Sequence, residues 1–277
     1  MPLIQRREFL KASAAGAAAL ALGSRAFADE NPYGTFKMGV QSYTFRGIKT
    51  LDDVLARVKE LGLKNIEFYP GHMPMTSDPA KIAEYKEKLA AAGITAMAYG
   101  VHSFGEKPDD NRKMFEFAKA MGLYCVSSFF KPKAALSLDK LCEEFPDIRL
   151  GIHNHGSKDS YPSPDDVLEC VKDRHKNIGS TADLGWFIVS KQDPVECIEK
   201  LKDRLFGIHF KDFTDKNQER IVGDGQLKVK ETLAALKKAN FQGCISLEYE
   251  DNKEGLPKLL EDVKVALDRV QKAVKEI

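Results

Sequence analysis

The sequence feature that most constrains the fold is a regular alternation of two kinds of segment, which begins near Lys37 and continues to the C-terminus. Short runs rich in β-branched or aromatic residues are each followed by a longer stretch with the apolar spacing of a helix. Eight strands and eight helices in strict alternation predict an α/β protein, a closed (β/α)8 TIM barrel. The predicted strands are Met38–Phe45, Asn65–Tyr69, Ile94–Val101, Tyr124–Phe130, Ile148–His153, Ile178–Asp183, Leu205–Phe210 and Cys244–Glu248. The predicted helices are Leu51–Leu61, Pro79–Ala92, Asp109–Met121, Ser137–Glu144, Pro164–Val171, Asp193–Lys202, Val229–Ala239 and Leu256–Val274.

Residues at the segment boundaries support this alternation. Asp78, Ser163 and Asp193 each precede a proline, so a capping side chain stands before the residue type favoured in the first helical turn. Glycines that would end three helices are Gly62, Gly93 and Gly122. An open doubly wound sheet is the competing architecture, but no Gly-x-Gly-x-x-Gly follows the first predicted strand.

Residues 1–28 have the features of an export signal. Arg6 and Arg7 are followed by an uncharged, Ala-rich run and then by Ala26-Phe27-Ala28. A twin arginine before an apolar region and an A-x-A cleavage site predicts a signal peptide of the twin-arginine pathway. A transmembrane helix is the alternative, but the apolar run is too short to cross a bilayer. We therefore expect a periplasmic or otherwise exported protein whose mature part, residues 29–277, forms a single barrel domain.

The charge of the mature part excludes some partners. Removal of residues 1–28 takes away four basic residues and one acidic residue, so the formal net charge changes from +1 to −2. A slightly acidic protein has no electrostatic reason to bind nucleic acid, or an anionic membrane once the signal is cleaved. The five cysteines are odd in number and lack a C-x-x-C pair, so we interpret them as small buried core thiols.

Residues able to bind a metal stand at the ends of four predicted strands. His153 and His155 are two residues apart, which places them on the same face of an extended segment. Asp183, His209 and Glu248 end three later strands. Because the C-terminal ends of barrel strands meet at one rim, we expect these side chains to form one metal site. A mixed set of nitrogen and oxygen ligands suits Mn, Co or Zn better than Mg or Ca.

Other candidates lie near strand ends and each has a structural alternative. Tyr43 and Trp186 fit a substrate platform as well as the core, and a lone histidine such as His102 is more often structural than functional. Lys211 is a candidate for substrate binding and catalysis. Glu67 is a candidate catalytic residue, or a buried carboxylate paired with Lys or Arg.

Several motifs resemble those of the sugar phosphate isomerase/epimerase family, whose members have a xylose-isomerase-like barrel, and the resemblance spans the mature chain. The matching segments are Ile66-Glu67, His153-Asn-His155, Asp183-Leu-Gly-Trp186, His209-Phe-Lys-Asp212, Gly223-Asp-Gly225 and Leu247-Glu248-Tyr249. In such enzymes the ends of strands five to eight supply a Glu, Asp, His and Glu metal quartet. The resemblance therefore implies His153, Asp183, His209 and Glu248 as ligands, with His153 in place of the first glutamate. The symmetric two-glutamate mechanism of the epimerases consequently does not carry over unchanged.

The resemblance implies proton-transfer chemistry on a sugar. A divalent ion bound to a keto-sugar would act as a Lewis acid that stabilises an enediolate. We expect His155 to be the base, with Glu248 as second candidate, and Lys211 to hold the developing oxyanion. Trp186 and Phe187 would offer an apolar face to the sugar ring.

We therefore expect a metal-dependent isomerase or epimerase that acts on an unphosphorylated sugar or keto-sugar. Export argues against a phosphorylated metabolite, and no glycine-rich phosphate-binding loop is present. The same enolate could lose a substituent or react with water, so a 3-keto-glycoside lyase or keto-glucal hydratase is the alternative. A non-catalytic sugar-binding barrel is a third hypothesis, and a nuclease of the endonuclease-IV branch is disfavoured by the slightly acidic charge. Barrels of this kind often pair, so a homodimer is an expected arrangement.

Overall fold

The computed structural model describes residues 31–156, 161–251 and 253–277 of the chain. The predicted signal peptide, residues 1–28, lies outside the described residues. No helix in the described part is long and apolar enough to cross a membrane.

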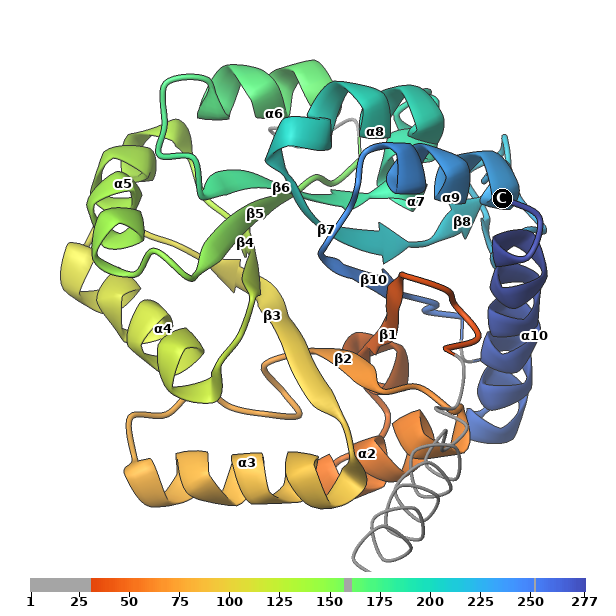
Figure 1. The fold of residues 1–277 in the computed structure, drawn as a ribbon, viewed down its shortest axis with the longest axis horizontal. Helices are drawn as coiled ribbons and strands as arrows, with labels where there is room; N and C mark the ends of the chain where they lie inside the picture. Colours follow the sequence, from red (N-terminus) through yellow and green to blue (C-terminus); the bar gives the residue numbers. More distant parts are fainter. Residues whose placement is uncertain (1–30, 157–160, 252) are drawn as a thin grey trace, which may run out of the picture.

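Eight parallel strands form a closed barrel, which confirms the predicted architecture (Figure 1). They pair in the order β1-β10-β7-β6-β5-β4-β3-β2, and the ring closes between β2 and β1. Every position of β6 and β7 is buried, as expected for strands packed on both faces. The strands are β1 Lys37–Gln41, β2 Asn65–Phe68, β3 Thr95–Ser103, β4 Cys125–Phe129, β5 Arg149–His153, β6 Ile178–Asp183, β7 Leu205–Phe210 and β10 Cys244–Leu247.

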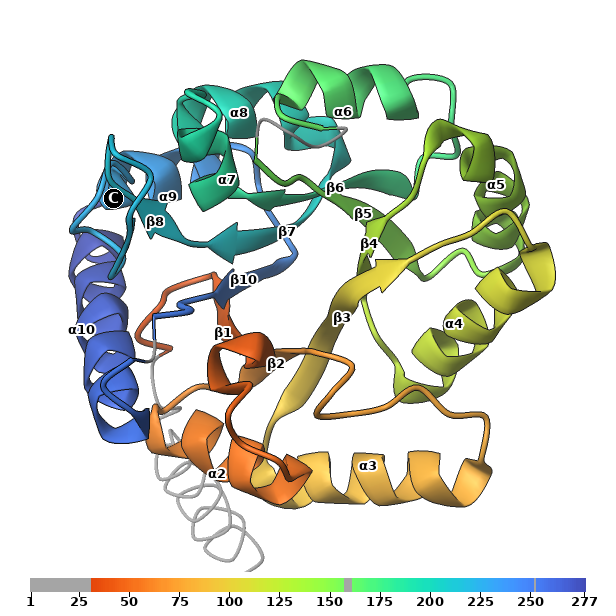
Figure 2. The same cartoon turned by 180° about the vertical axis from the view of Figure 1, so that it is seen from behind.

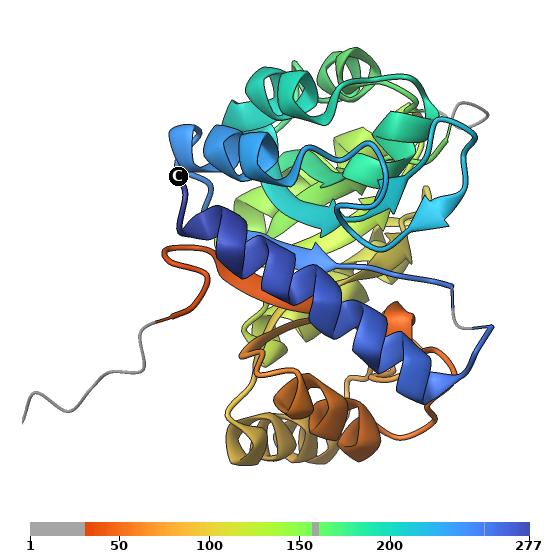
Figure 3. The ribbon, with the colours of Figure 1, turned by 90° about the vertical axis from the view of Figure 1, so that its right-hand side faces the viewer.

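Helices surround the barrel, as the two opposite views of Figures 1 and 2 show. Figure 3 shows α10 lying across the outside of the barrel beside the end of the chain. The eight predicted helices are observed, with boundaries shifted by at most two residues. They are α2 Leu51–Glu60, α3 Pro79–Ala92, α4 Pro108–Met121, α5 Ala135–Glu144, α6 Pro164–Val171, α8 Pro194–Leu201, α9 Val229–Lys238 and α10 Leu256–Val274.

The predicted caps are present. Asp78 and Asp193 accept hydrogen bonds from backbone N–H groups in the first turns of α3 and α8, and Ser163 forms a capping box at α6. Gly93 and Gly122 end α3 and α4 in the left-handed conformation that glycine adopts without steric penalty. The cysteines are free, with four buried and Cys170 partly buried, in agreement with their interpretation as core thiols.

Two local departures from the predicted elements shape the rim of the barrel. Strand β1 ends at Gln41, whose side chain accepts the Tyr43 N–H, and a 3-10 turn over Ser42–Phe45 replaces the rest of the predicted strand. A short helix that was not predicted, α7 (Leu184–Val189), follows β6 directly. Asp183 is its N-cap, since one carboxylate oxygen accepts the Trp186 N–H at 2.9 Å.

A loop between β7 and α9 is organised by one buried carboxylate. In this loop β8 (Asp212–Phe213) pairs antiparallel with β9 (Glu219–Arg220). The Asp212 carboxylate accepts backbone N–H groups of Gly223, Gly225 and Leu227, each at 2.9 Å. A Cβ at Gly225 would lie 2.2 Å from Asp212 Oδ1, so this close approach requires glycine.

Replacing Asp212 with alanine should destabilise the protein by about 2–4 kcal/mol, because three backbone N–H groups, of which that of Leu227 is buried, would lose a charged acceptor. The free energy of unfolding can be measured by chemical denaturation. The control is Asp215→Ala, since Asp215 is exposed in the same loop. Equal stability of the two variants would contradict the role given to Asp212.

Candidate metal and sugar site

The predicted site residues gather around a cavity of about 450 Å³ at the C-terminal ends of the strands. Ten residues were predicted to form the site. Seven of them line the cavity: Tyr43, His153, His155, Trp186, His209, Lys211 and Glu248. Asp183 is fully buried beside it, whereas Glu67 and His102 lie elsewhere.

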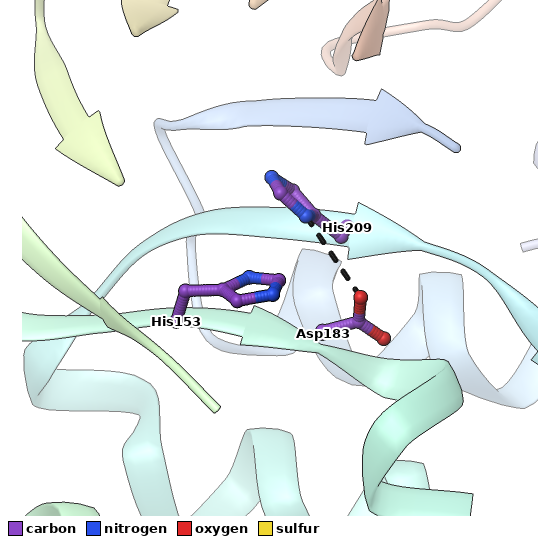
Figure 4. Close-up of side chains that lie close together, drawn as sticks. All are labelled: His153, Asp183 and His209. Carbon is purple, nitrogen blue, oxygen red and sulfur yellow. Dashed lines mark ion pairs between the residues drawn. The ribbon is translucent and has the colours of Figure 1, made fainter. Parts of the chain in front are cut away.

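Three potential ligand atoms converge at one point. His153, Asp183 and His209 each offer one atom, and these atoms all lie within 4.8 Å of one another (Figure 4). The three residues are at most 9% exposed. Among the described residues, His153 Nδ1 and Asp183 Oδ2 find no hydrogen-bond partner, whereas His209 Nδ1 has Asp183 Oδ2 at 3.8 Å and a Glu248 oxygen at 3.1 Å. Buried polar atoms are nearly always paired, so two unpaired ligand atoms beside a third fit a bound cation.

Glu248 adds a carboxylate to this group from the segment that follows β10. Its Oε2 lies 3.1 Å from His209 Nδ1 and 3.8 Å from Lys211 Nζ. Burial alone would raise the pKa of Glu248, but Lys211 and His209 outweigh it and hold that pKa well below its usual range. Glu248 is therefore an anion at neutral pH, beside the three converging ligand atoms.

Glu67 lies behind His209 and does not face the cavity. Its Oε1 is 3.0 Å from His209 Nε2, and its Oε2 accepts a hydrogen bond from Ser246 at 2.8 Å. Its partner is thus a histidine, where the sequence had suggested Lys or Arg. This contact directs the Nε2–H of His209 toward Glu67 and leaves Nδ1 facing the other ligand atoms, as in metal sites where a carboxylate orients a histidine ligand.

Asn154 fixes the backbone at Asp183, a role that sequence reasoning missed. Its side-chain amide donates to the Asp183 carbonyl at 2.9 Å and accepts the Asp183 N–H at 2.8 Å. Strands β5 and β6 are thereby joined where both supply a ligand atom. The available signal was the position of Asn154 between two candidate histidines, which puts its side chain on the opposite face of the segment.

The two buried imidazoles have opposite acid–base tendencies when no metal is bound. Burial, and then the charge of His209, lower the pKa of His153 well below 6.5. Burial also disfavours protonation of His209, but the carboxylates of Glu67 and Glu248 outweigh it and raise that pKa well above 6.5. Burial raises the pKa of Asp183 to about 7. In the metal-free protein, the proton on His209 Nδ1 therefore lies on the side of the ring where a cation would bind.

Lys211 is a buried cation held among carboxylates. It is 2% exposed, forms an ion pair with Glu250, and has Glu219 Oε1 at 3.8 Å. Burial opposes its charge, yet the surrounding carboxylates raise its pKa above the ordinary value. Burial raises the pKa of Glu219 to about 7. Glu219 was not predicted, because it lies on the short β9 strand and no periodic pattern marks it.

Aromatic rings form the walls of the cavity. His155 and Trp186 pack against each other in a tilted arrangement, with centroids 4.1 Å apart and an interplanar angle of 34°. Tyr43 packs edge-on against Tyr69 at 4.9 Å. Phe187, expected to face the sugar beside Trp186, is fully buried, because successive residues of helix α7 point in different directions.

His102 does not line the cavity. Its ring packs edge-on against Phe104, with centroids 4.7 Å apart, and burial lowers its pKa. The residue before it, Val101, lines the cavity instead. The register of β3 with β4 shifts between Tyr99 and His102, and such an irregularity re-aims the side chains beside it.

Comparisons with known proteins agree with this fold. Residues 55–269 match the family described as xylose isomerase-like TIM barrel. Residues 3–23 match the signal sequence of the twin-arginine translocation pathway, which confirms the predicted export route.

Similar proteins cover the barrel to different extents. The crystal structure of an uncharacterized protein from Parabacteroides distasonis is 27% identical, with a TM-score of 0.68 over 86% of this chain and 99% of that one. D-psicose 3-epimerase from Clostridium cellulolyticum, solved with D-tagatose, is 14% identical, with a TM-score of 0.71 over 86% and 99%. An uncharacterized protein from Methanocaldococcus jannaschii is 33% identical over 119 residues, which are 41% of this chain and 40% of that protein. The chain thus spans less than half of that relative.

In the metal-free protein we expect His209 to keep both ring protons at pH 7, because its pKa is raised by two carboxylates. Replacing Glu67 with glutamine removes one negative charge and should lower this pKa. Histidine ¹H–¹⁵N spectra recorded over a pH series report it directly, with the exposed Glu261→Gln as control. A His209 that titrates near 6.5 in the unmodified protein would contradict the assignment.

Proposed function

Because the chain belongs to the xylose isomerase-like TIM barrel family, we propose that it is a divalent-metal-dependent enzyme that isomerises or epimerises an unphosphorylated sugar or keto-sugar. The convergence of His153, Asp183 and His209 beside a cavity that also holds a candidate base supports this function. The likeness in fold to an epimerase solved with D-tagatose supports ketoses as the substrate class.

His153, Asp183, His209 and Glu248 would hold the metal. Their nitrogen and oxygen atoms suit Mn, Co or Zn. When bound there, such an ion supplies Lewis acidity that stabilises the negative charge of an enediolate. The contact between Glu67 and His209 would keep Nδ1 available as a ligand, so Glu67 acts as a positioning residue.

His155 is the candidate base for abstracting the proton. It lines the cavity, and its ring lies against Trp186, so the imidazole is presented beside an aromatic surface suited to a sugar ring. Glu248 is the second candidate. Lys211 and His209 stabilise its anion and hold its pKa below the ordinary value of a glutamate, which weakens it as a base. His153 stands where the family quartet has its first glutamate. Proton transfer on the two faces of the sugar carbon would therefore be carried out by two different kinds of side chain.

Lys211 would stabilise negative charge on the substrate oxygen. Its ammonium group lines the cavity, and its raised pKa keeps it protonated, which disfavours a Schiff-base role. Among the described lining residues it is the lone Lys or Arg, beside the acidic Glu248 and Glu250. One cationic side chain beside two carboxylates disfavours binding of a phosphate group and supports an unphosphorylated substrate.

Proton exchange provides the test of this function. The purified protein is loaded with Mn²⁺, Co²⁺ or Zn²⁺ and incubated in D2O with D-fructose, D-tagatose, D-psicose and keto-glycosides. We expect metal-dependent incorporation of deuterium next to the carbonyl of at least one sugar, and product analysis identifies an isomer, an epimer or an elimination product. Absence of metal binding and of exchange with every sugar would overturn the proposal.

Three single variants separate metal binding from proton transfer. His153→Ala and Glu248→Ala should each lose metal, measured by metal analysis after gel filtration, because a ligand is removed. His155→Ala should retain metal and lose at least about a hundredfold in exchange rate, as expected for loss of a general base. Normal exchange in the His155 variant would remove this residue from the base role.

The location and extent of the mature protein complete the proposal. The twin-arginine signal directs export. We place the enzyme in the periplasm, with residues 29–277 as one domain.

A further inference from the structure

A second cavity, of about 480 Å³, adjoins the first. Its lining comes from the end of the 3-10 turn after β1, from β9, and from the segment after β10. Glu250 lines both cavities. The Glu250 side chain is 33% exposed. The two cavities therefore meet at an accessible carboxylate and are not separated by packed core residues.

The residues between the two cavities are held in place by several contacts. Arg46 donates a hydrogen bond to the Glu250 carbonyl, and its guanidinium lies over the Tyr43 ring, 5.0 Å from the centroid. Glu219 accepts the Glu250 N–H at 3.0 Å. Glu250 itself forms the ion pair with Lys211. The residues between the cavities are therefore held in a fixed arrangement, and Glu250 reaches both cavities.

The chemistry of the second cavity suits an uncharged, hydroxylated ligand. Its charged lining residues are three basic and three acidic side chains, namely Arg46, Arg220, Lys253, Glu219, Glu250 and Asp251. The formal charges balance, and Glu219, with a pKa raised to about 7, is only partly ionised at neutral pH, so the cavity carries no strong net charge to attract an anion or a cation. Carboxylates accept hydrogen bonds from hydroxyl groups and guanidinium groups donate to them, so adjacent groups of both kinds can bind a polyol.

We propose that the second cavity is a subsite for a second sugar ring, joined by a glycosidic bond to the ring that reacts in the first cavity. This inference rests on the proposed function, which places the reacting sugar in the first cavity. The preferred substrate is then a keto-disaccharide or other glycosylated ketose, with the glycosidic link passing beside Glu250.

Binding to the full, Zn²⁺-loaded protein tests the subsite. Trp186 is the single tryptophan of the chain and lines the first cavity, so its fluorescence reports occupancy without requiring turnover. The probes are D-fructose and three glucosyl-fructoses that differ in linkage: turanose, maltulose and isomaltulose. We expect at least one disaccharide to bind about tenfold more tightly than D-fructose, which corresponds to about 1.4 kcal/mol.

Two variants of the β8–β9 loop identify the cavity responsible. Arg220→Ala should weaken binding of the preferred disaccharide about tenfold and that of D-fructose less than twofold. The matched control is Lys216→Ala, an exposed residue of the same loop that does not line the cavity. Equal binding of all four sugars, or equal effects of the two variants, would overturn the subsite.

Deuterium exchange of D-fructose, measured in parallel, separates this inference from the proposed function. Exchange without a preference for disaccharides would refute the subsite alone. A disaccharide preference that depends on Arg220, without exchange of any sugar, would support the subsite and count against the proposed reaction.

Discussion

The site depends on potential ligand atoms that the barrel buries close together at one point. His153, Asp183 and His209 come from three adjacent strands, and the closed ring brings their side chains together. His153 Nδ1 and Asp183 Oδ2 make no hydrogen bond among the described residues, and His209 Nδ1 lies between Asp183 and Glu248. Burying an unpaired polar atom costs about 1–3 kcal/mol, more for a charged group, so two of them beside a third ligand atom are hard to explain as packing. A cation bound by all three residues would offset this cost.

The fold and the convergence of His153, Asp183 and His209 could be predicted because both follow from periodicity. Alternating segments imply the barrel, and the two-residue spacing in His153-Asn-His155 places both imidazoles on one face. Contacts between segments that are far apart in the sequence have no such signal. The pairing of Glu67 with His209, and the approach of Glu219 to Lys211, depend on three-dimensional packing and were not predicted.

Local helix geometry accounts for other differences. Helix α7 is only six residues long, too short for a periodic pattern, and its turn buries Phe187 while leaving Trp186 at the cavity. His102 was predicted from its position near a strand end, but β3 has a register shift between Tyr99 and His102, and Val101 lines the cavity instead. Sequence reasoning therefore located the rim correctly and was less accurate about which neighbouring side chain faces inward.

The proposed chemistry requires a divided charge distribution, in which Asp183 and Glu248 favour a cation while Lys211 favours an oxyanion beside it. The most direct test is anomalous diffraction from crystals grown with Zn²⁺ or Co²⁺. We expect one strong peak about 2.0–2.2 Å from nitrogen atoms of His153 and His209 and from an oxygen of Asp183. Metal-soaked crystals with no anomalous density between these three side chains would contradict the account.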